Sequence, residues 1–346
     1  MNNKFFPSNF LFIMIMVAGT LFTLSSSHWL SMWMGLELNL MGFLPLINIK
    51  GKVLEAEASM KYFIIQSMSS SVLIMSSVIM YMINLSWYSM FTNNTMSILI
   101  ILSLVLKLGG APLHFWLPSV TKKMAWITLF LMLTWQKLAP LLMLTLINSN
   151  LYTVLLISIM STITGSIMAL NQTNIQLIMT YSSISHLGWM LSCISVNSSL
   201  TLIYFLNYVI ISIPLMNLFS QSSGDHLFML TQKTKPNNLI TISLILSLAG
   251  LPPLLGFMSK FIMLMSLLKN NMIMITLFMF LGTLISLYFY LSMSLMLMIK
   301  SYMTFKRQST NKSYNSIVSF NIFSAFIIYP FIILFVKYAM TILYKP

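Results

Sequence analysis

The sequence predicts an all-α polytopic membrane protein with about eleven transmembrane helices, at roughly 20 residues for each span. Of its 346 residues, 58% are hydrophobic and only 6% are charged, whereas a soluble domain carries about 25% charged residues. Apolar stretches of span length recur along the whole chain, and two of them carry the same Gly-Pro punctuation. These observations exclude a soluble globular protein.

Short polar connections separate the apolar stretches, as is usual between neighbouring helices. They read SSSH at 25–28, KGK at 50–52, NN at 93–94, TKK at 121–123, NSN at 148–150, NQT at 171–173, VNS at 196–198 and KNN at 269–271. The expected helices are 8–25, 29–49, 54–84, 96–120, 124–147, 151–170, 174–195, 199–222, 238–268, 272–300 and 317–343. We expect a first five-helix bundle at 1–147, a second, inverted one at 148–300, and a loop with a C-terminal transmembrane helix at 301–346.

Two of the expected spans are interrupted by Gly and Pro. The fourth reads LKLGGAP at 106–112 and the ninth reads LSLAGLPP at 246–253. Because Pro lacks a backbone donor and clashes with the preceding turn, both helices should be broken at depth, although a simple kink in each is the alternative. The two segments lie five spans apart and so run in opposite directions. Paired interruptions in an inverted repeat indicate a transport site near the middle of the membrane.

The loops also predict which way the chain crosses the membrane. The basic residues on the N-terminal side are Lys4, Lys50, Lys52, Lys122, Lys123, Lys233, Lys235, Lys300, Lys306, Arg307 and Lys312, and those on the opposite side are Lys269 and Lys345. By the positive-inside rule, the N-terminus lies in the cytoplasm or a mitochondrial matrix, and the C-terminus lies opposite.

Ionisable residues within the expected spans are the main candidates for function. Glu37 and Lys137 lie near the centres of their helices, Lys107 adjoins the first interruption, and Lys260 lies about two turns beyond the second. A charge at a helix centre costs roughly 2.5–3.5 kcal/mol on insertion scales, so such residues are functional by default. Structural ion pairs are the alternative. Since three lysines face one acid, a proton relay fits better than pairwise neutralisation, and we expect Glu37 and Lys107 within about 4–6 Å of each other.

Histidines could serve as intermediate proton carriers, since an unperturbed imidazole titrates near pH 6.5. His114 follows the first interruption and His186 lies in the middle of a span, where each could equally be a buried ring bonded to neighbouring hydroxyls. The single cysteine, Cys193, and the spacing of the four histidines predict no metal site. The chain has no dinucleotide or P-loop motif.

The formal charge of +14 does not indicate a nucleic-acid partner, because the sequence offers no soluble basic face. Anionic lipid such as cardiolipin is the expected partner for the basic loops.

Six segments resemble, in order, the chain 2 family of mitochondrial NADH:ubiquinone oxidoreductase, respiratory complex I, in its animal form, in which the chain starts directly with the repeat. The segments are WMGLELNLMGFLPL (33–46), EAEASMKYF (55–63), KLGGAPLHFWLP (107–118), LTWQKLAPL (133–141), LNQTNIQLIMTYSSISHLGWML (170–191) and LAGLPPLLGFMSKF (248–261). The resemblance implies antiporter-like inverted five-helix bundles with two broken helices. Matched position by position, it implies a relay of Glu37, Lys107, Lys137 and Lys260, with His114 and His186 on the same polar axis.

The resemblance further implies a core subunit that translocates protons across the mitochondrial inner membrane. NADH, FMN, iron–sulfur clusters and ubiquinone would be bound by partner subunits of a hetero-oligomer, not by this chain. A stand-alone cation/proton antiporter and a non-pumping structural spacer are the alternatives.

Overall fold

The computed structural model describes residues 7–84, 94–147, 151–221, 235–252 and 254–305, and every regular element in these ranges is an α-helix. The predicted span 317–343 and most of the predicted part 301–346 lie outside the described residues. The helices are α1 (Pro7–Ser25), α2 (Trp29–Ile47), α3 (Val53–Asn84), α4 (Asn94–Leu108), α5 (Trp116–Thr121), α6 (Trp126–Leu133), α7 (Trp135–Thr145), α8 (Leu151–Leu170), α9 (Ile175–Ile194), α10 (Ser198–Gln221), α11 (Lys235–Ala249), α12 (Leu255–Lys269) and α13 (Ile273–Phe305).

The described helices confirm the predicted fold class. Seven helical stretches are long and apolar enough to cross a membrane, and two shorter apolar helices, Met96–Leu108 and Ile240–Ala249, lie at the predicted interruptions. Each of the seven long stretches exposes large apolar side chains, such as Phe10 on α1 and Met274 on α13. Such surfaces are expected where a helix is in contact with lipid or other subunits. The count of about eleven spans stays a prediction.

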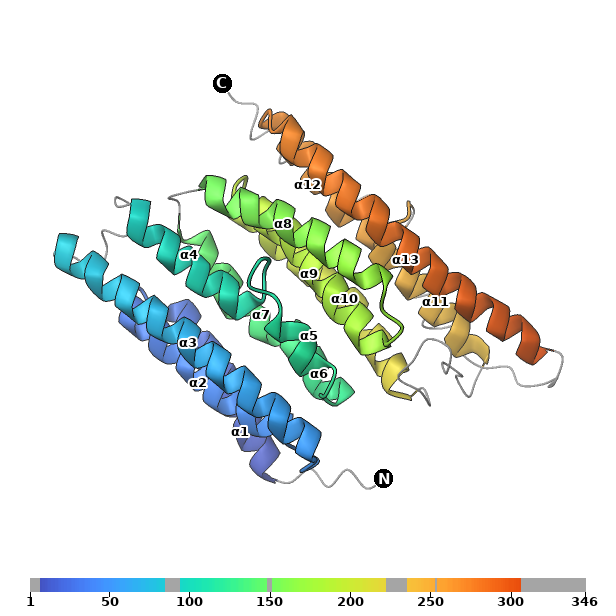
Figure 1. The fold of residues 1–346 in the computed structure, drawn as a ribbon, viewed down its shortest axis with the longest axis horizontal. Coiled ribbons are helices and arrows are strands. Elements are labelled where there is room, and N and C mark those ends of the chain that lie inside the picture. The colour runs from blue at the N-terminus through green and yellow to red at the C-terminus, as the bar shows by residue number, and fades with distance from the viewer. Residues whose placement is uncertain (1–6, 85–93, 148–150, 222–234, 253, 306–346) are drawn as a thin grey trace. The chain divides into compact units, whose positions relative to one another are not determined.

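The chain divides into two compact units. The first consists of residues 1–165 and 179–198, and the second of 166–178 and 199–346. In the first unit α1 packs along α2, α2 along α3, and α3 along α4, which also contacts α7. In the second unit α11, α12 and α13 pack together (Figure 1). The predicted bundle boundaries at 147 and 300 stay a prediction.

Glycines allow α1 and α2 to approach backbone to backbone. A Cβ built on Gly35 would lie 2.8 Å from Thr23 N and 2.9 Å from the carbonyl of Gly19, and one on Gly42 would lie 2.7 Å from Met16 N. Small residues at helix interfaces are the usual means of close packing in membranes. This contact holds α2, and with it Glu37, in a fixed position against α1.

Gly35→Ala is therefore expected to separate α1 from α2. The added methyl group meets backbone atoms that cannot rotate away, and overpacking of this kind costs about 1–3 kcal/mol. We expect less of the chain to reach its mature assembly, measured by native gel. Leu38→Ala, at an exposed position of the same helix, is the control. Equal amounts of both variants would contradict the close contact.

Both predicted interruptions are present, and they have the same local structure. Helix α4 ends at Leu108 and α11 ends at Ala249, and in each case a left-handed glycine follows, Gly109 with φ 73° and Gly250 with φ 85°. Gly109 N bonds Leu106 O and Gly110 N bonds Val105 O, while Gly250 N bonds Ser247 O and Leu251 N bonds Leu246 O. Both sets are the hydrogen bonds of a Schellman motif.

The Schellman motif leaves the last two carbonyls of each helix free for other donors. They belong to Lys107 and Leu108 in the first unit and to Leu248 and Ala249 in the second. In the first interruption, residues 109–111 are buried and Pro112 is exposed. In the second, Gly250 and Leu251 are half-buried and Pro252 is exposed.

The predicted span 124–147 is not one continuous helix, which corrects our expectation for Lys137. Helix α6 ends at Leu133, Thr134 has φ −115° and ψ −73°, and α7 begins at Trp135. The Thr134 hydroxyl donates to Phe130 O at 2.7 Å, a bond that tends to bend helices. Pro140, which cannot donate within α7, weakens the helix further along. Lys137 thus lies in the first turn of α7, next to an irregular turn.

Candidate functional site

Glu37 and Lys107 lie on α2 and α4 of the first unit. Glu37 is half-buried, and its Oε1 is buried without a hydrogen-bond partner among the described residues. Lys107, in the last turn of α4, is 8% exposed. The carboxylate acts on Lys107 through space. However, the ion pairs within 4.0 Å in the described part of the chain join Glu57 to Lys61 and Lys123 instead. The expected separation of Glu37 and Lys107 stays a prediction.

Lys137 is the most deeply buried of the three lysines, at 2% exposed. Its Nζ donates to the backbone carbonyl of Ser183 on α9 at 3.0 Å. The partner is neutral, and no carboxylate lies within 4.0 Å of Lys137 Nζ among the described residues. Lys137 and Ser183 both belong to the first unit.

Lys260 lies on α12 in the second unit and is 7% exposed. Its Nζ donates to the carbonyls of Leu248 at 3.2 Å and Ala249 at 2.9 Å. These are the two carbonyls that the Schellman motif leaves free at the end of α11. The sequence predicted an ammonium near this interruption, and the structure supplies the acceptors that hold it there.

The two candidate histidines are both buried. His114, at 3% exposed, lies in the interruption between α4 and α5 and stacks on Phe115, with ring centroids 4.4 Å apart. Its Nδ1 has no hydrogen-bond partner among the described residues. His186, at 6% exposed, lies within α9. Their role as proton carriers stays a prediction.

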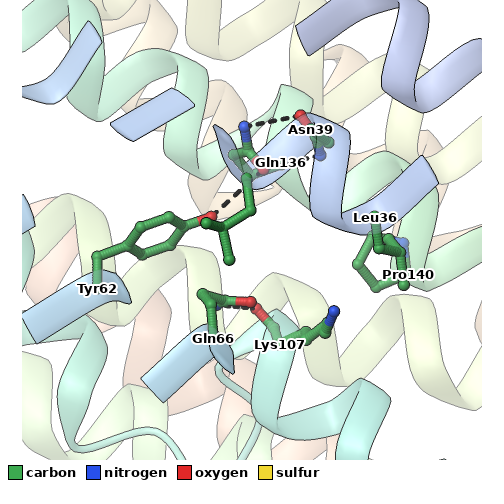
Figure 2. A pocket seen from close by; sticks show the side chains of 8 residues that line it. Leu36, Asn39, Tyr62, Gln66, Lys107, Gln136 and Pro140 are labelled. Atoms are coloured by element: carbon green, nitrogen blue, oxygen red, sulfur yellow. Dashed lines mark hydrogen bonds between the residues drawn. The ribbon is translucent and has the colours of Figure 1, made fainter. Parts of the chain in front are cut away.

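A polar cavity of about 20 Å³ adjoins Lys107, and the sequence assigns no role to the uncharged polar residues that line it. Its walls come from four helices and consist of Leu36, Asn39, Leu40, Tyr62, Gln66, Lys107, Gln136 and Pro140 (Figure 2). The signal was present in the sequence, because uncharged polar residues such as Asn39 and Gln136 stand in otherwise apolar spans. Because these residues carry no charge, they do not stand out in the sequence as candidate site residues.

Hydrogen bonds join three of these side chains, as Figure 2 shows. Asn39 Nδ2 donates to Gln136 Oε1 at 2.9 Å, and Gln136 Nε2 donates back to Asn39 Oδ1 at 3.1 Å. The Tyr62 hydroxyl donates to Gln136 Oε1 at 3.4 Å. The Tyr62 ring packs against Phe43 and Trp116, with ring centroids 5.4 and 5.9 Å away. The cavity wall is therefore fixed by both packing and hydrogen bonds.

No metal centre is formed by the described residues, among which no three His, Cys, Asp or Glu side chains gather in a group that could hold an ion. Two of the buried lysines, Lys137 and Lys260, are instead held by neutral carbonyl oxygen atoms. Such amino groups can take up or release protons.

The chain is similar to known proteins over most of its length. A family model described as NADH:quinone oxidoreductase/Mrp antiporter, transmembrane, matches residues 26–286. The chain is 40% identical over 269 residues to NADH-ubiquinone oxidoreductase chain 2 of Anopheles gambiae, covering 75% of this chain and 77% of the relative. It is 39% identical over 269 residues to the chain 2 protein of Loxodonta africana, with the same coverage of 75% and 77%.

Solved structures share the fold. A chain of respiratory complex I from Thermus thermophilus superposes with a TM-score of 0.80 at 22% identity, covering 92% of this chain and 76% of that one. A chain of an Mrp complex from a Dietzia species superposes with a TM-score of 0.73 at 17% identity, covering 83% of this chain and 59% of that one.

Proposed function

The chain belongs to the family of NADH-ubiquinone oxidoreductase chain 2, and from this membership we propose that it conducts protons through a relay of Glu37, Lys107, Lys137 and Lys260. It is a multi-pass membrane subunit of an oxidoreductase complex, respiratory complex I, and has the antiporter-like fold of proton-pumping subunits. The relay of these four residues is the part of this proposal that membership of the family does not show.

The partners of the buried lysines carry the proposal. Lys137 and Lys260 donate to backbone carbonyls, which stay neutral whether or not the ammonium is charged. A lysine that loses its proton at such a site leaves no unpaired carboxylate behind. In a structural ion pair, by contrast, losing one partner strands the other charge at a cost of about 3–5 kcal/mol. Neutral partners are therefore more consistent with lysines that change protonation during turnover than with lysines that only hold helices together.

Glu37 supplies the negative charge of the relay in the first unit. It acts on Lys107 without forming a close pair, so the interaction can change when either helix moves. His114 and His186 are secondary carriers in this proposal.

We propose that the redox cofactors are bound by partner chains and not by this chain. NADH, FMN, iron–sulfur clusters and ubiquinone would be bound by other subunits of the hetero-oligomer, and this chain would receive their energy through its contacts. We further propose the mitochondrial inner membrane as its location, with the N-terminus on the matrix side, because the predicted loops on that side hold most of the lysines. Cardiolipin is the anionic lipid that these loops would attract.

Glu37→Gln tests the relay, because it removes the charge while keeping the shape of the side chain. We expect full assembly and a clear loss of proton uptake per NADH in reconstituted vesicles. Glu57→Gln, which changes an exposed carboxylate paired with Lys61 and Lys123, is the matched control. An assembled Glu37→Gln complex with an unchanged proton ratio would remove Glu37 from the relay. A chain that purifies without any NADH-oxidising assembly would instead support the stand-alone antiporter.

A further inference from the structure

Lys137 lies at an irregular point of its helix. Helix α7 begins two residues before it, directly after the irregular turn at Thr134. Lys137 N donates to Thr134 O at 3.2 Å, across three residues instead of four, so this first turn is wound more tightly than a regular α-helix. Among the described residues, Lys137 Nζ donates to one acceptor, Ser183 O at 3.0 Å. Continuity with α6 therefore does not by itself fix the direction of the Lys137 side chain.

The residue before Lys137 ties the same turn to α2. Gln136 Oε1 accepts from Asn39 Nδ2 at 2.9 Å, and Gln136 Nε2 donates to Asn39 Oδ1 at 3.1 Å (Figure 2). The Tyr62 hydroxyl on α3 adds a third bond to Gln136 Oε1, at 3.4 Å. Helix α7 packs chiefly along α4, so this link to α2 is made by side chains and not by close helix packing. Two bonds between the same two amides fix their relative orientation as well as their distance.

The two neighbouring side chains hold the first turn of α7 from different directions. Successive residues of a helix point about 100° apart, so Gln136 and Lys137 leave this turn toward different helices, α2 and α9. A rotation that moved Lys137 Nζ away from Ser183 O would also pull the Gln136 amide away from Asn39. Asn39 is 3% exposed, and a buried amide that loses its partner is costly. The amide pair therefore resists the rotation that would displace the Lys137 ammonium.

An amide pair is suited to a site whose other members change charge. Amides do not titrate, so the bonds between Asn39 and Gln136 are the same in every protonation state of the lysines. Asn39 also follows Glu37 by two residues on α2. A movement of α2 at Glu37 would thus reach the turn of Lys137 through a link of fixed length.

We infer that Asn39 and Gln136 are positioning residues for Lys137, and that their paired amides hold the first turn of α7 where the ammonium meets the Ser183 carbonyl. The pair exchanges no protons itself. Its importance for proton transfer rests on the proposed function of Lys137.

A structure of the assembled complex carrying Asn39→Leu together with Gln136→Met tests the positioning directly. Apolar side chains of similar size replace both amides, so neither amide is left without its partner, and replacing both partners can be nearly neutral for stability. We expect assembly, with the distance from Lys137 Nζ to Ser183 O lengthened beyond about 3.5 Å, the limit of a hydrogen bond. An unchanged bond to Ser183 would overturn the inference. This result does not depend on pumping, so it is distinct from failure of the relay.

Proton uptake by the same double variant tests the effect on Lys137. We expect the rate to fall by about 10-fold, within the 10²-fold that a misplacement of about 1 Å can cost. In a Lys137→Met complex the double substitution should cause no further loss, because the side chain that the pair positions is gone. A purely structural pair would lower the rate by the same factor with or without Lys137.

The exchanged pair, Asn39→Gln with Gln136→Asn, is the matched control. It keeps both amides and their combined length, and we expect it to restore assembly and the rate of proton uptake. A wild-type rate in the assembled Asn39→Leu, Gln136→Met complex, or an equal further loss in the Lys137→Met complex, would overturn the positioning role. Failure of that double variant to assemble, where the exchanged pair does assemble, would assign the amides to folding and would also overturn it.

Discussion

Gly256→Ala is expected to reduce the amount of assembled complex several-fold. Gly256 is the second residue of α12, and a Cβ built on it would lie 1.7 Å from the Ser247 carbonyl oxygen of α11. The obstacle is backbone in the last turn of a helix, so α12 must move as a whole. Overpacking costs about 1–3 kcal/mol and occasionally more. The shift would also draw Lys260, one turn further along, away from its two carbonyl acceptors.

Native gels quantify this effect, and Gly110→Ala provides the control at the other interruption. A Cβ on Gly110 would meet side chains only, the nearest atom being Val105 Cγ1 at 2.9 Å, and these can rotate away. We expect Gly110→Ala to assemble much better than Gly256→Ala. The reverse order would show that the contact between α11 and α12 does not limit assembly.

Lys137→Met is expected to leave assembly intact and to lower proton transfer through this chain by about 10²-fold, at the low end of the contribution of a positioned acid–base group. Methionine keeps most of the aliphatic volume of lysine and fits a helix. The partner left behind is the carbonyl of Ser183, not a stranded carboxylate. The complex should therefore fold, and its NADH oxidation should slow wherever turnover is tightly coupled to pumping.

Proton uptake per NADH in reconstituted vesicles measures this effect, after the assembled enzyme has been quantified. Lys269→Met, the same substitution at an exposed residue at the end of α12, is the matched control. Failure of assembly in Lys137→Met would point to a structural role for the lysine. Full assembly with an unchanged proton ratio would rule it out as an obligatory carrier.

The sequence predicts the fold class and both interruptions because these depend on local chemistry. Apolar runs have to be helical in lipid, where every backbone group needs an internal partner. Gly109 and Gly250 end their helices because only glycine readily adopts the left-handed conformation there. The sequence does not predict the break at Thr134, because a threonine and a proline six residues apart are tolerated in many continuous helices.

The candidate site could be predicted only in part, for a different physical reason. Charged residues in apolar spans are visible in the sequence, and the structure buries Lys107, Lys137 and Lys260. Their partners are backbone carbonyls, which every residue has and no residue type reveals. The pairing of Asn39 with Gln136 spans 97 positions, and only the packing of α2 against its neighbours brings the two amides together.

The two Schellman endings have an electrostatic consequence. The C-terminus of a helix carries about half a negative elementary charge, from its aligned peptide dipoles. Lys107 lies in the last turn of α4, and Lys260 donates to the last carbonyls of α11. With each lysine protonated, the helix end and the ammonium together carry about half a positive charge, and with it deprotonated about half a negative charge. The net charge at each helix end therefore changes from about half positive to about half negative when the lysine loses its proton. Neither protonation state places a full uncompensated charge inside the membrane.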